Sequence, residues 1–252
     1  HIAMQDAKAG QPVTLDRGII RILAPNPSPL TGPGTNTYLV GTGAGIAVID
    51  PGPAVPAHLD AILASLDPGQ RVSHILVTHP HADHSALTPA LAAATGALTF
   101  GYGPAGSGRS PRMQAIADTA DLGGGEGNDA GFAPDQRLAH GDVVIGEGWQ
   151  FGVLHCPGHM AEHLCFALGD RLFSGDHVMG WSTSLVSPPD GDMGAYMASL
   201  DLLSQRQWSW FLPRHGPVIG DPAARLAALA VHRRMREAAV LGALTSGLLS
   251  LD

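Results

Sequence analysis

The sequence predicts an α/β protein in which two β-sheets are covered by helices. Short apolar runs that end in turn residues alternate with segments whose apolar residues have helical spacing. Several apolar runs end directly in a histidine or an aspartate, a position where active-site groups often stand on a rigid sheet. The 252 residues are enough for one large α/β domain with a substantial core.

The first third of the chain is predicted to contain most of one sheet. Residues 13–23 and 36–50 read as β-structure, and the Gly-Thr-Gly at 41–43 predicts a hairpin turn within the second segment. Leucine and isoleucine at helical spacing across 55–66 predict a helix that leads back to a strand at 72–78.

A second helix is predicted directly after that strand. Ser85 is the expected N-cap, and Gly96 is the expected stop. The following stretch, 102–140, is rich in glycine and poor in large apolar residues, so we expect a partly ordered loop beside the functional site, with a plain surface linker as the alternative. Arg109 and Arg112 lie in this loop, where they either meet a substrate anion or remain solvated.

The last part of the chain is predicted to alternate strands and helices again. Apolar runs at 149–154, 172–174 and 210–212 predict three strands. Asp221 and Pro222 then predict the cap and the first turn of a terminal helix.

The expected domain organisation is one catalytic domain followed by a helical segment. The catalytic domain is assigned to residues 4–220, and the C-terminal helical segment, packed on it or extending from it, to 221–252. Residues 1–3 precede Met4 and read as an expression remnant. The basic run 232–236 is expected on the exposed face of the terminal helix.

Composition limits the class of partner. The chain has 14 basic and 22 acidic residues, which argues against a broad nucleic-acid-binding surface because phosphate neutralisation dominates such affinity. The binding of a short single-stranded RNA in a metal cleft is compatible with this composition, but a small-molecule substrate is favoured.

The chain has no apolar run of about 18 residues, so no membrane span is predicted. Cys156 and Cys165 predict buried free thiols rather than a disulfide framework, in keeping with a cytoplasmic location. The oligomeric state is left open.

The most informative segment is 78–84, which reads Thr-His-Pro-His-Ala-Asp-His after an apolar run. Imidazole and carboxylate are the ligands that zinc and neighbouring divalent metals prefer. If the apolar run is a strand, His79 and His81 point to the same side of its end, while Asp83 and His84 face a second point. Four such groups are hard to explain as core residues, because burying unpaired polar groups costs free energy. The motif therefore predicts half of a two-metal site.

Three later segments provide the missing ligands. His159 follows the tight Pro157-Gly158 turn, Asp176 ends a short apolar strand, and His215 ends another. The ligand-type residues then form two sets of three and one carboxylate suited to bridge them: His79, His81 and His159; Asp83, His84 and His215; and Asp176. Open coordination positions are typical of catalytic zinc, and paired metals about 3.5–4 Å apart hold a hydroxide and clamp a substrate oxygen.

These motifs resemble the metallo-β-lactamase superfamily of hydrolases. The His-X-His-X-Asp-His run, the Pro-Gly-His turn, the Ser-Gly-Asp strand end and the late His-Gly occur in order over roughly residues 36–216. The segments 36–41 and 48–52 are similar to the glyoxalase II and β-lactamase-like protein 2 branches. The resemblance implies a four-layer αβ/βα sandwich of two mixed β-sheets flanked by helices, with a dinuclear site. True metallo-β-lactamases typically have Cys or Ser where this chain has Asp176, which points away from β-lactam hydrolysis.

The expected activity is that of a dinuclear hydrolase with two zinc ions per chain, or with iron or manganese in their place. It would act on an ester, thioester, lactone or phosphodiester through a metal-bridging hydroxide. Asp83 is expected to hold and relay the proton. His163 is a candidate general acid or substrate contact, or else it hydrogen-bonds nearby. The alternatives are a mononuclear-iron persulfide dioxygenase, a metal-dependent endoribonuclease and a non-enzymatic metal-binding protein.

Residues beside the ligands are expected to support the site. Asp50 either orients a ligand histidine from behind or caps its own turn. His177 and residues 181–183 follow Asp176 and are expected to line the cleft, with packing as the alternative role of Trp181.

Overall fold

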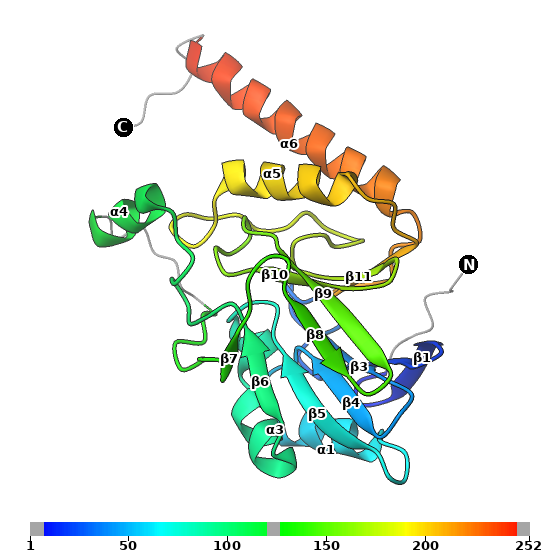
Figure 1. Cartoon of the computed structure of the whole chain (residues 1–252). Helices are drawn as coiled ribbons and strands as arrows, with labels where there is room; N and C mark the ends of the chain where they lie inside the picture. The colour runs from blue at the N-terminus through cyan, green and yellow to red at the C-terminus, as the bar shows by residue number, and fades with distance from the viewer. Residues whose placement is uncertain (1–7, 120–126, 246–252) are drawn as a thin grey trace.

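The computed structural model describes residues 8–119 and 127–245 and has four layers (Figure 1). Two β-sheets pack face to face, and helices cover the outer face of each sheet. The predicted αβ/βα arrangement of two mixed sheets is therefore confirmed. The expression remnant expected at 1–3, the glycine-rich part at 120–126 and the end of the C-terminal segment from 246 lie outside the described residues.

The first sheet has seven strands in the described part of the chain, arranged in sequence order. Neighbouring strands are antiparallel from the first to the fourth and parallel from the fourth to the seventh. The predicted turn at 41–43 joins the third and fourth strands. The strands are β1 (Pro12–Asp16), β2 (Ile19–Leu23), β3 (Asn36–Val40), β4 (Gly45–Ile49), β5 (Arg71–Leu76), β6 (Leu98–Gly101) and β7 (Gln136–Arg137).

The second sheet contains the three strands predicted from the later apolar runs. Its order is β12-β11-β10-β9-β8, with β11 and β12 parallel and the other neighbours antiparallel. The strands are β8 (Val143–Gly146), β9 (Trp149–His155), β10 (Leu164–Leu168), β11 (Arg171–Gly175) and β12 (Trp210–Pro213).

Helices bury the outer faces of both sheets. Ile62 of α1 (Pro56–Ala64) and Leu91 of α3 (Thr88–Thr95) pack on the first sheet. Leu200 of α5 (Met193–Ser204) and Leu226 of α6 (Pro222–Thr245) pack on the second sheet. Figure 1 shows these two pairs of helices on opposite sides of the molecule. The glycine-rich stretch contains a further helix, α4 (Pro111–Thr119), and the strand β7.

The predicted start of the second helix is wrong. Ser85 is the last residue of a separate short helix, α2 (Ala82–Ser85), and its hydroxyl donates to the His81 carbonyl at 3.0 Å. The longer helix α3 begins at Thr88, and it ends as predicted at Gly96, whose φ of +72° suits glycine. The predicted terminal helix is confirmed, because the Asp221 carboxylate accepts the Ala224 N–H at 3.0 Å.

The core between the sheets is apolar and aromatic, and it fixes the strand ends that carry the site. Phe173 of β11 contacts Tyr38 of β3 edge-on, with ring centroids 5.2 Å apart, and also contacts Phe151 of β9.

Cys156 and Cys165 are buried free thiols, as predicted. Across residues 8–119 and 127–245, no helix is both long enough and apolar enough to cross a membrane.

Candidate metal centre

The seven predicted ligands converge from both sheets onto one edge of the sandwich. Each lies in or beside a loop that follows a strand end, where loops carry functional groups on a rigid scaffold. Grouped by the strand that each one follows, the candidate ligands are His79, His81, Asp83 and His84 after β5; His159 after β9; Asp176 after β11; and His215 after β12.

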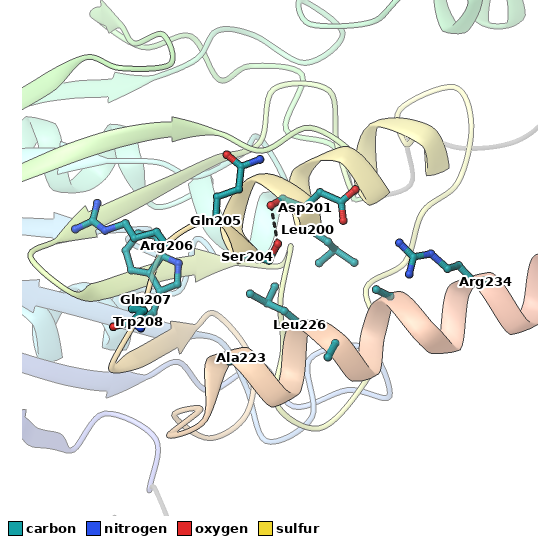
Figure 2. Close-up of a pocket in the computed structure, with 12 residues that line it drawn as sticks. Leu200, Asp201, Ser204, Gln205, Arg206, Gln207, Trp208, Ala223, Leu226 and Arg234 are labelled. Carbon is teal, nitrogen blue, oxygen red and sulfur yellow. Dashed lines mark hydrogen bonds between the residues drawn. The ribbon is translucent and has the colours of Figure 1, made fainter.

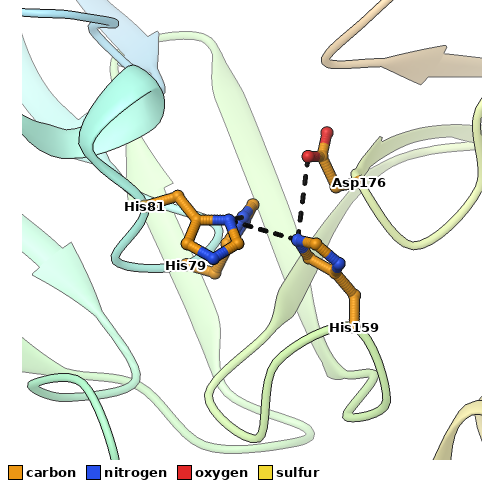
Figure 3. A group of neighbouring side chains, drawn as sticks. All are labelled: His79, His81, His159 and Asp176. Carbon is orange, nitrogen blue, oxygen red and sulfur yellow. Dashed lines mark hydrogen bonds and ion pairs between the residues drawn. The ribbon is translucent and has the colours of Figure 1, made fainter. Parts of the chain in front are cut away.

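The first group contains three histidines and Asp176, whose ligand atoms all lie within 4.8 Å of one another. Figure 3 shows the side chains pointing toward one another. His81 Nδ1 lies 2.9 Å from His79 Nε2 and 3.2 Å from His159 Nε2. Burial and the neighbouring imidazoles lower the pKa of His81 to about 3, so its ring is neutral, as metal ligation requires.

The second group contains Asp83, His84 and His215, and it lies beside the Asp176 carboxylate of the first group. His215 Nε2 lies 3.2 Å from Asp83 Oδ2. Asp176 Oδ2 lies 3.5 Å from His215 Nε2, 3.4 Å from His84 Nε2 and 3.7 Å from His159 Nε2. A single oxygen therefore faces both groups, the position expected of a bridging ligand.

The donor set fits metal ions. Among the described residues, His84 Nε2 and Asp176 Oδ1 are buried and lack a hydrogen-bond partner. Such atoms are costly to bury unless something satisfies them. Imidazole nitrogens and carboxylate oxygens suit zinc, iron and manganese. The cluster could hold metal ions in both groups.

Asp50 lies behind the candidate ligands and orients one of them, His84. Its Oδ2 lies 3.2 Å from His84 Nδ1, and its carboxylate also accepts the Thr78 N–H at 2.6 Å and the Thr78 hydroxyl at 2.8 Å. Its backbone has a φ of +50°, which is uncommon for a residue with a side chain. When His84 Nδ1 donates to Asp50, the Nε2 lone pair is directed at the ligand cluster.

Two further ligands are held through their second ring nitrogen. His159 Nδ1 lies 2.6 Å from the Leu185 carbonyl, and His215 Nδ1 lies 3.2 Å from the Gly34 carbonyl. In each case Nδ1 can donate to the carbonyl, which leaves Nε2 facing the cluster. These contacts fix the ring orientation of two candidate ligands.

Arg214 is a supporting residue that the sequence reasoning missed. It is 1% exposed and donates to the backbone carbonyls of Asn36 and, at 3.1 Å, Asp83. Its Nε lies 3.5 Å from Asp50 Oδ2. The signal available in the sequence was its position directly before His215, but its partners are far away along the chain.

His163 does not have the position expected of a general acid. It is fully buried, and its Nε2 accepts the Asp176 backbone N–H at 3.1 Å. Burial, followed by the neighbouring His177 and His159, lowers its pKa well below the usual value. These contacts favour the alternative role, in which His163 hydrogen-bonds nearby and positions the backbone of Asp176.

The other predicted neighbours divide between the site and the interior. His177 is fully buried, so it does not line a cleft. Trp181 is 46% exposed and packs beside Gly216, next to a ligand. Arg109 forms an ion pair with Asp190, with Nε and Oδ1 3.2 Å apart, so its charge is already compensated. Arg112 is an exposed residue of α4, in agreement with the solvated alternative.

A separate groove of about 650 Å³ lies between α5 and α6 (Figure 2). Leu200, Leu226 and Trp208 provide apolar lining, and Arg206 and Arg234 lie along it. None of the seven candidate ligands lines this groove. The groove is therefore distinct from the metal-ligand cluster.

Two candidate ligands of the second group, His84 and His215, have raised pKa values. Burial disfavours the charged form, but the Asp83 and Asp176 carboxylates outweigh it and raise the pKa of His84 to about 9. For His215, burial likewise opposes the charge, and the same carboxylates raise the pKa to about 10. Both imidazoles are thus protonated at neutral pH and must lose a proton to bind metal.

Metal binding is therefore expected to release about two protons per chain near pH 7, one from each of these histidines. Because protons compete with metal below the raised pKa values, apparent affinity should rise from pH 6.5 toward pH 9. Calorimetric titration of the metal-free protein with zinc, in buffers with different ionisation enthalpies, measures the protons released. An enthalpy that is the same in every buffer would contradict this expectation.

Comparison with known proteins agrees with this fold. Residues 30–207 match the family model of the metallo-beta-lactamase superfamily. The lactamase-like protein nscB of Aspergillus fumigatus is 34% identical over 234 residues, which are 92% of this chain and 62% of that protein. The atrochrysone carboxyl ACP thioesterase dmxR1 of Cryptosporiopsis sp. is 32% identical over 229 residues, which are 90% and 62% of the two chains. The chain thus spans about three-fifths of the length of these relatives.

Solved structures show the same architecture. A metallo-beta-lactamase family protein from Thermus thermophilus superposes with a TM-score of 0.74 at 23% identity, covering 91% of this chain and 83% of that chain. The protein TTHA1623, solved in a di-iron-bound form, has a TM-score of 0.58 at 30% identity, covering 79% and 96%. With the family match over residues 30–207, the chain belongs to the metallo-beta-lactamase superfamily.

Proposed function

We propose that this protein is a dinuclear metal hydrolase that uses zinc and cleaves acyl thioesters. The observation that carries the proposal is the position of Asp176 Oδ2 between two groups of ligand atoms, 3.4 Å from His84 Nε2 and 3.7 Å from His159 Nε2. A site for one metal does not need a second set of donors around the same oxygen. The di-iron form of TTHA1623 supports two metals and makes iron the main alternative to zinc.

The ligand residues divide the chemical work. Two bound metal ions would supply Lewis acidity and, at neutral pH, hydroxide from a water of lowered pKa. Asp83 is proposed to take up and pass on a proton. Its side chain is 27% exposed, against 10% for Asp176, so it is the more accessible of the two ligand carboxylates. The Thr35 hydroxyl donates to Asp83 Oδ2 at 3.2 Å and holds this carboxylate in place.

A thioester substrate is supported by the names of the relatives. Two of them, from Cryptosporiopsis sp. and Aspergillus terreus, are named atrochrysone carboxyl ACP thioesterases, and each is 32% identical to this chain. Thioester hydrolysis needs the same elements as ester hydrolysis: a nucleophile, a polarised carbonyl and a stabilised leaving group. The thiolate of a thioester is a good leaving group, so a dedicated general acid is not required, which agrees with the buried position of His163.

The test combines metal analysis with a substrate panel. The purified protein is expected to contain about two zinc ions per chain. It should hydrolyse S-lactoylglutathione or an acyl-CoA faster than an acyl-homoserine lactone, a chromogenic cephalosporin or single-stranded RNA. One iron per chain with oxygen-dependent turnover of a persulfide would overturn the proposal. If the protein cleaves only RNA, the proposed metal centre would stand, but the proposed thioester substrate would be overturned.

A further inference from the structure

The segment 177–185 connects the metal-ligand cluster to the C-terminal helices. It follows Asp176 and contains no helix or strand. Irregular buried backbone needs partners for its carbonyl groups. Near the C-terminal end of the segment, the Ser184 hydroxyl donates to the Asp176 carbonyl at 2.6 Å. The carbonyl of the next residue, Leu185, lies 2.6 Å from His159 Nδ1. The position of this segment therefore affects two candidate ligands, Asp176 and His159.

Two arginines of α6 hold the segment. Arg225 donates from Nε to the Met179 carbonyl at 2.7 Å and from its second guanidinium nitrogen to the Ser182 carbonyl at 2.6 Å. Arg233 donates to the Ser184 carbonyl. The two arginines are eight residues apart, so they lie about 80° apart around the helix and project from the side that also buries Leu229.

Helix α5 holds the same segment through Tyr196. The Tyr196 hydroxyl donates to the His177 carbonyl at 3.0 Å. The Arg233 guanidinium lies 5.3 Å from the centroid of the Tyr196 ring, within the range of a cation–π contact. Arg233 therefore contacts the Tyr196 ring and also donates to the Ser184 carbonyl.

We infer that Arg233 and Arg225 are positioning residues for the metal centre, and that α6 is part of the metal-binding unit. The contacts run from the Arg233 guanidinium to the Ser184 carbonyl, and from Ser184 and its neighbour Leu185 to Asp176 and His159. Both of these ligands belong to the first group of donors, whereas Asp83, His84 and His215 are held by other partners. The inference rests on the proposed two-metal function, and it extends that function to a helix beyond the matched family region of 30–207.

The test is the metal affinity of Arg233→Met, which keeps an unbranched apolar stem and removes every donor. Zinc affinity is measured by chelator competition, and ligand geometry by the visible absorption spectrum of the cobalt-substituted protein. Loss of contacts behind a metal ligand typically weakens affinity about 10–100-fold. We expect a loss of that size for one zinc equivalent, a changed cobalt spectrum for that site and a smaller change for the other equivalent.

Two further variants make the result specific. Arg234→Met removes the neighbouring arginine, which is exposed and lines the α5–α6 groove, and it should keep wild-type affinity. Arg233→Lys keeps the charge and one donor group, and it should restore part of the affinity lost in Arg233→Met. If Arg233→Met does not fold, Arg225→Lys, which disturbs the same segment at Met179 and Ser182, takes its place in the same titration.

The outcomes separate this inference from the proposed function. Wild-type protein that fails to bind two metal ions would contradict the proposed function itself. Wild-type protein that binds two, together with an Arg233→Met protein of unchanged affinity and cobalt spectrum, would overturn only the positioning role. An equal loss of affinity in Arg233→Met and Arg234→Met would also overturn it. Both variants remove one positive charge from α6, so an equal loss would come from the charge and not from the contact with Ser184.

Discussion

Asp176→Ala is expected to lower thioester turnover by more than about 100-fold and to weaken binding of both metal ions. The reason is that Asp176 Oδ2 faces three ligand histidines from both groups, at 3.4 to 3.7 Å. Loss of a residue that only supports a ligand typically costs about 10–100-fold in metal affinity or activity, so loss of a shared ligand should cost more. Turnover and metal content are measured on the same preparation.

The matched control is Asp201→Ala. Asp201 is an exposed aspartate of α5 that lines the groove shown in Figure 2 and does not belong to either ligand group. This variant should retain both metal ions and wild-type turnover. Wild-type turnover by Asp176→Ala, with its metal content retained, would show that Asp176 does not bridge the two groups.

Gly175→Ala is expected to destabilise the fold and disturb the metal centre together. Gly175 has a φ of +54°, and a Cβ at this position would lie 2.5 Å from His163 Nε2. A left-handed conformation costs a residue with a Cβ roughly 1–2 kcal/mol, and overpacking typically costs about 1–3 kcal/mol more. Because His163 Nε2 accepts the Asp176 N–H, moving the ring also moves a ligand. Denaturant unfolding of the metal-free protein measures the first effect, and chelator competition measures the second.

Gly169→Ala provides a control with the same backbone strain and no clash. Gly169 has a φ of +59°, and a Cβ there would have no neighbour within 4 Å. Its free energy of unfolding should fall by only about 1–2 kcal/mol, and its metal affinity should be unchanged. Equal destabilisation of the two variants, with metal affinity intact in Gly175→Ala, would show that His163 does not hold Asp176 in position.

The candidate ligands could be predicted from sequence because they stand at, or a few residues after, the ends of apolar runs. A strand ending is a local feature, and strands that run in the same direction bring such endings to one edge of the sheet. The pattern at 78–84 and the single residues His159, Asp176 and His215 needed no knowledge of long-range contacts. The structure places these residues in two groups: His79, His81, His159 and Asp176 in one, and Asp83, His84 and His215 in the other.

The supporting residues could not be predicted, because their roles depend on distant partners. Arg214 binds the carbonyl of Asn36, 178 residues earlier in the chain. The Ser85 hydroxyl donates to the His81 carbonyl and to the Asp129 carboxylate, 44 residues away, so the local capping rule failed there. The sequence left His163 as a candidate general acid or a residue that hydrogen-bonds nearby, because its burial among other side chains depends on the fold. The contacts of α6 with the segment 177–185 likewise involve separations of more than 40 residues.

The most direct test of the account is a crystal structure of the zinc-loaded protein with anomalous scattering measured at the zinc edge. The account predicts two anomalous peaks about 3.5–4 Å apart. One should lie among His79, His81 and His159, the other among Asp83, His84 and His215, with an Asp176 oxygen bound to both. A single peak in a fully loaded crystal, or two peaks with Asp176 bound to neither, would contradict the dinuclear centre.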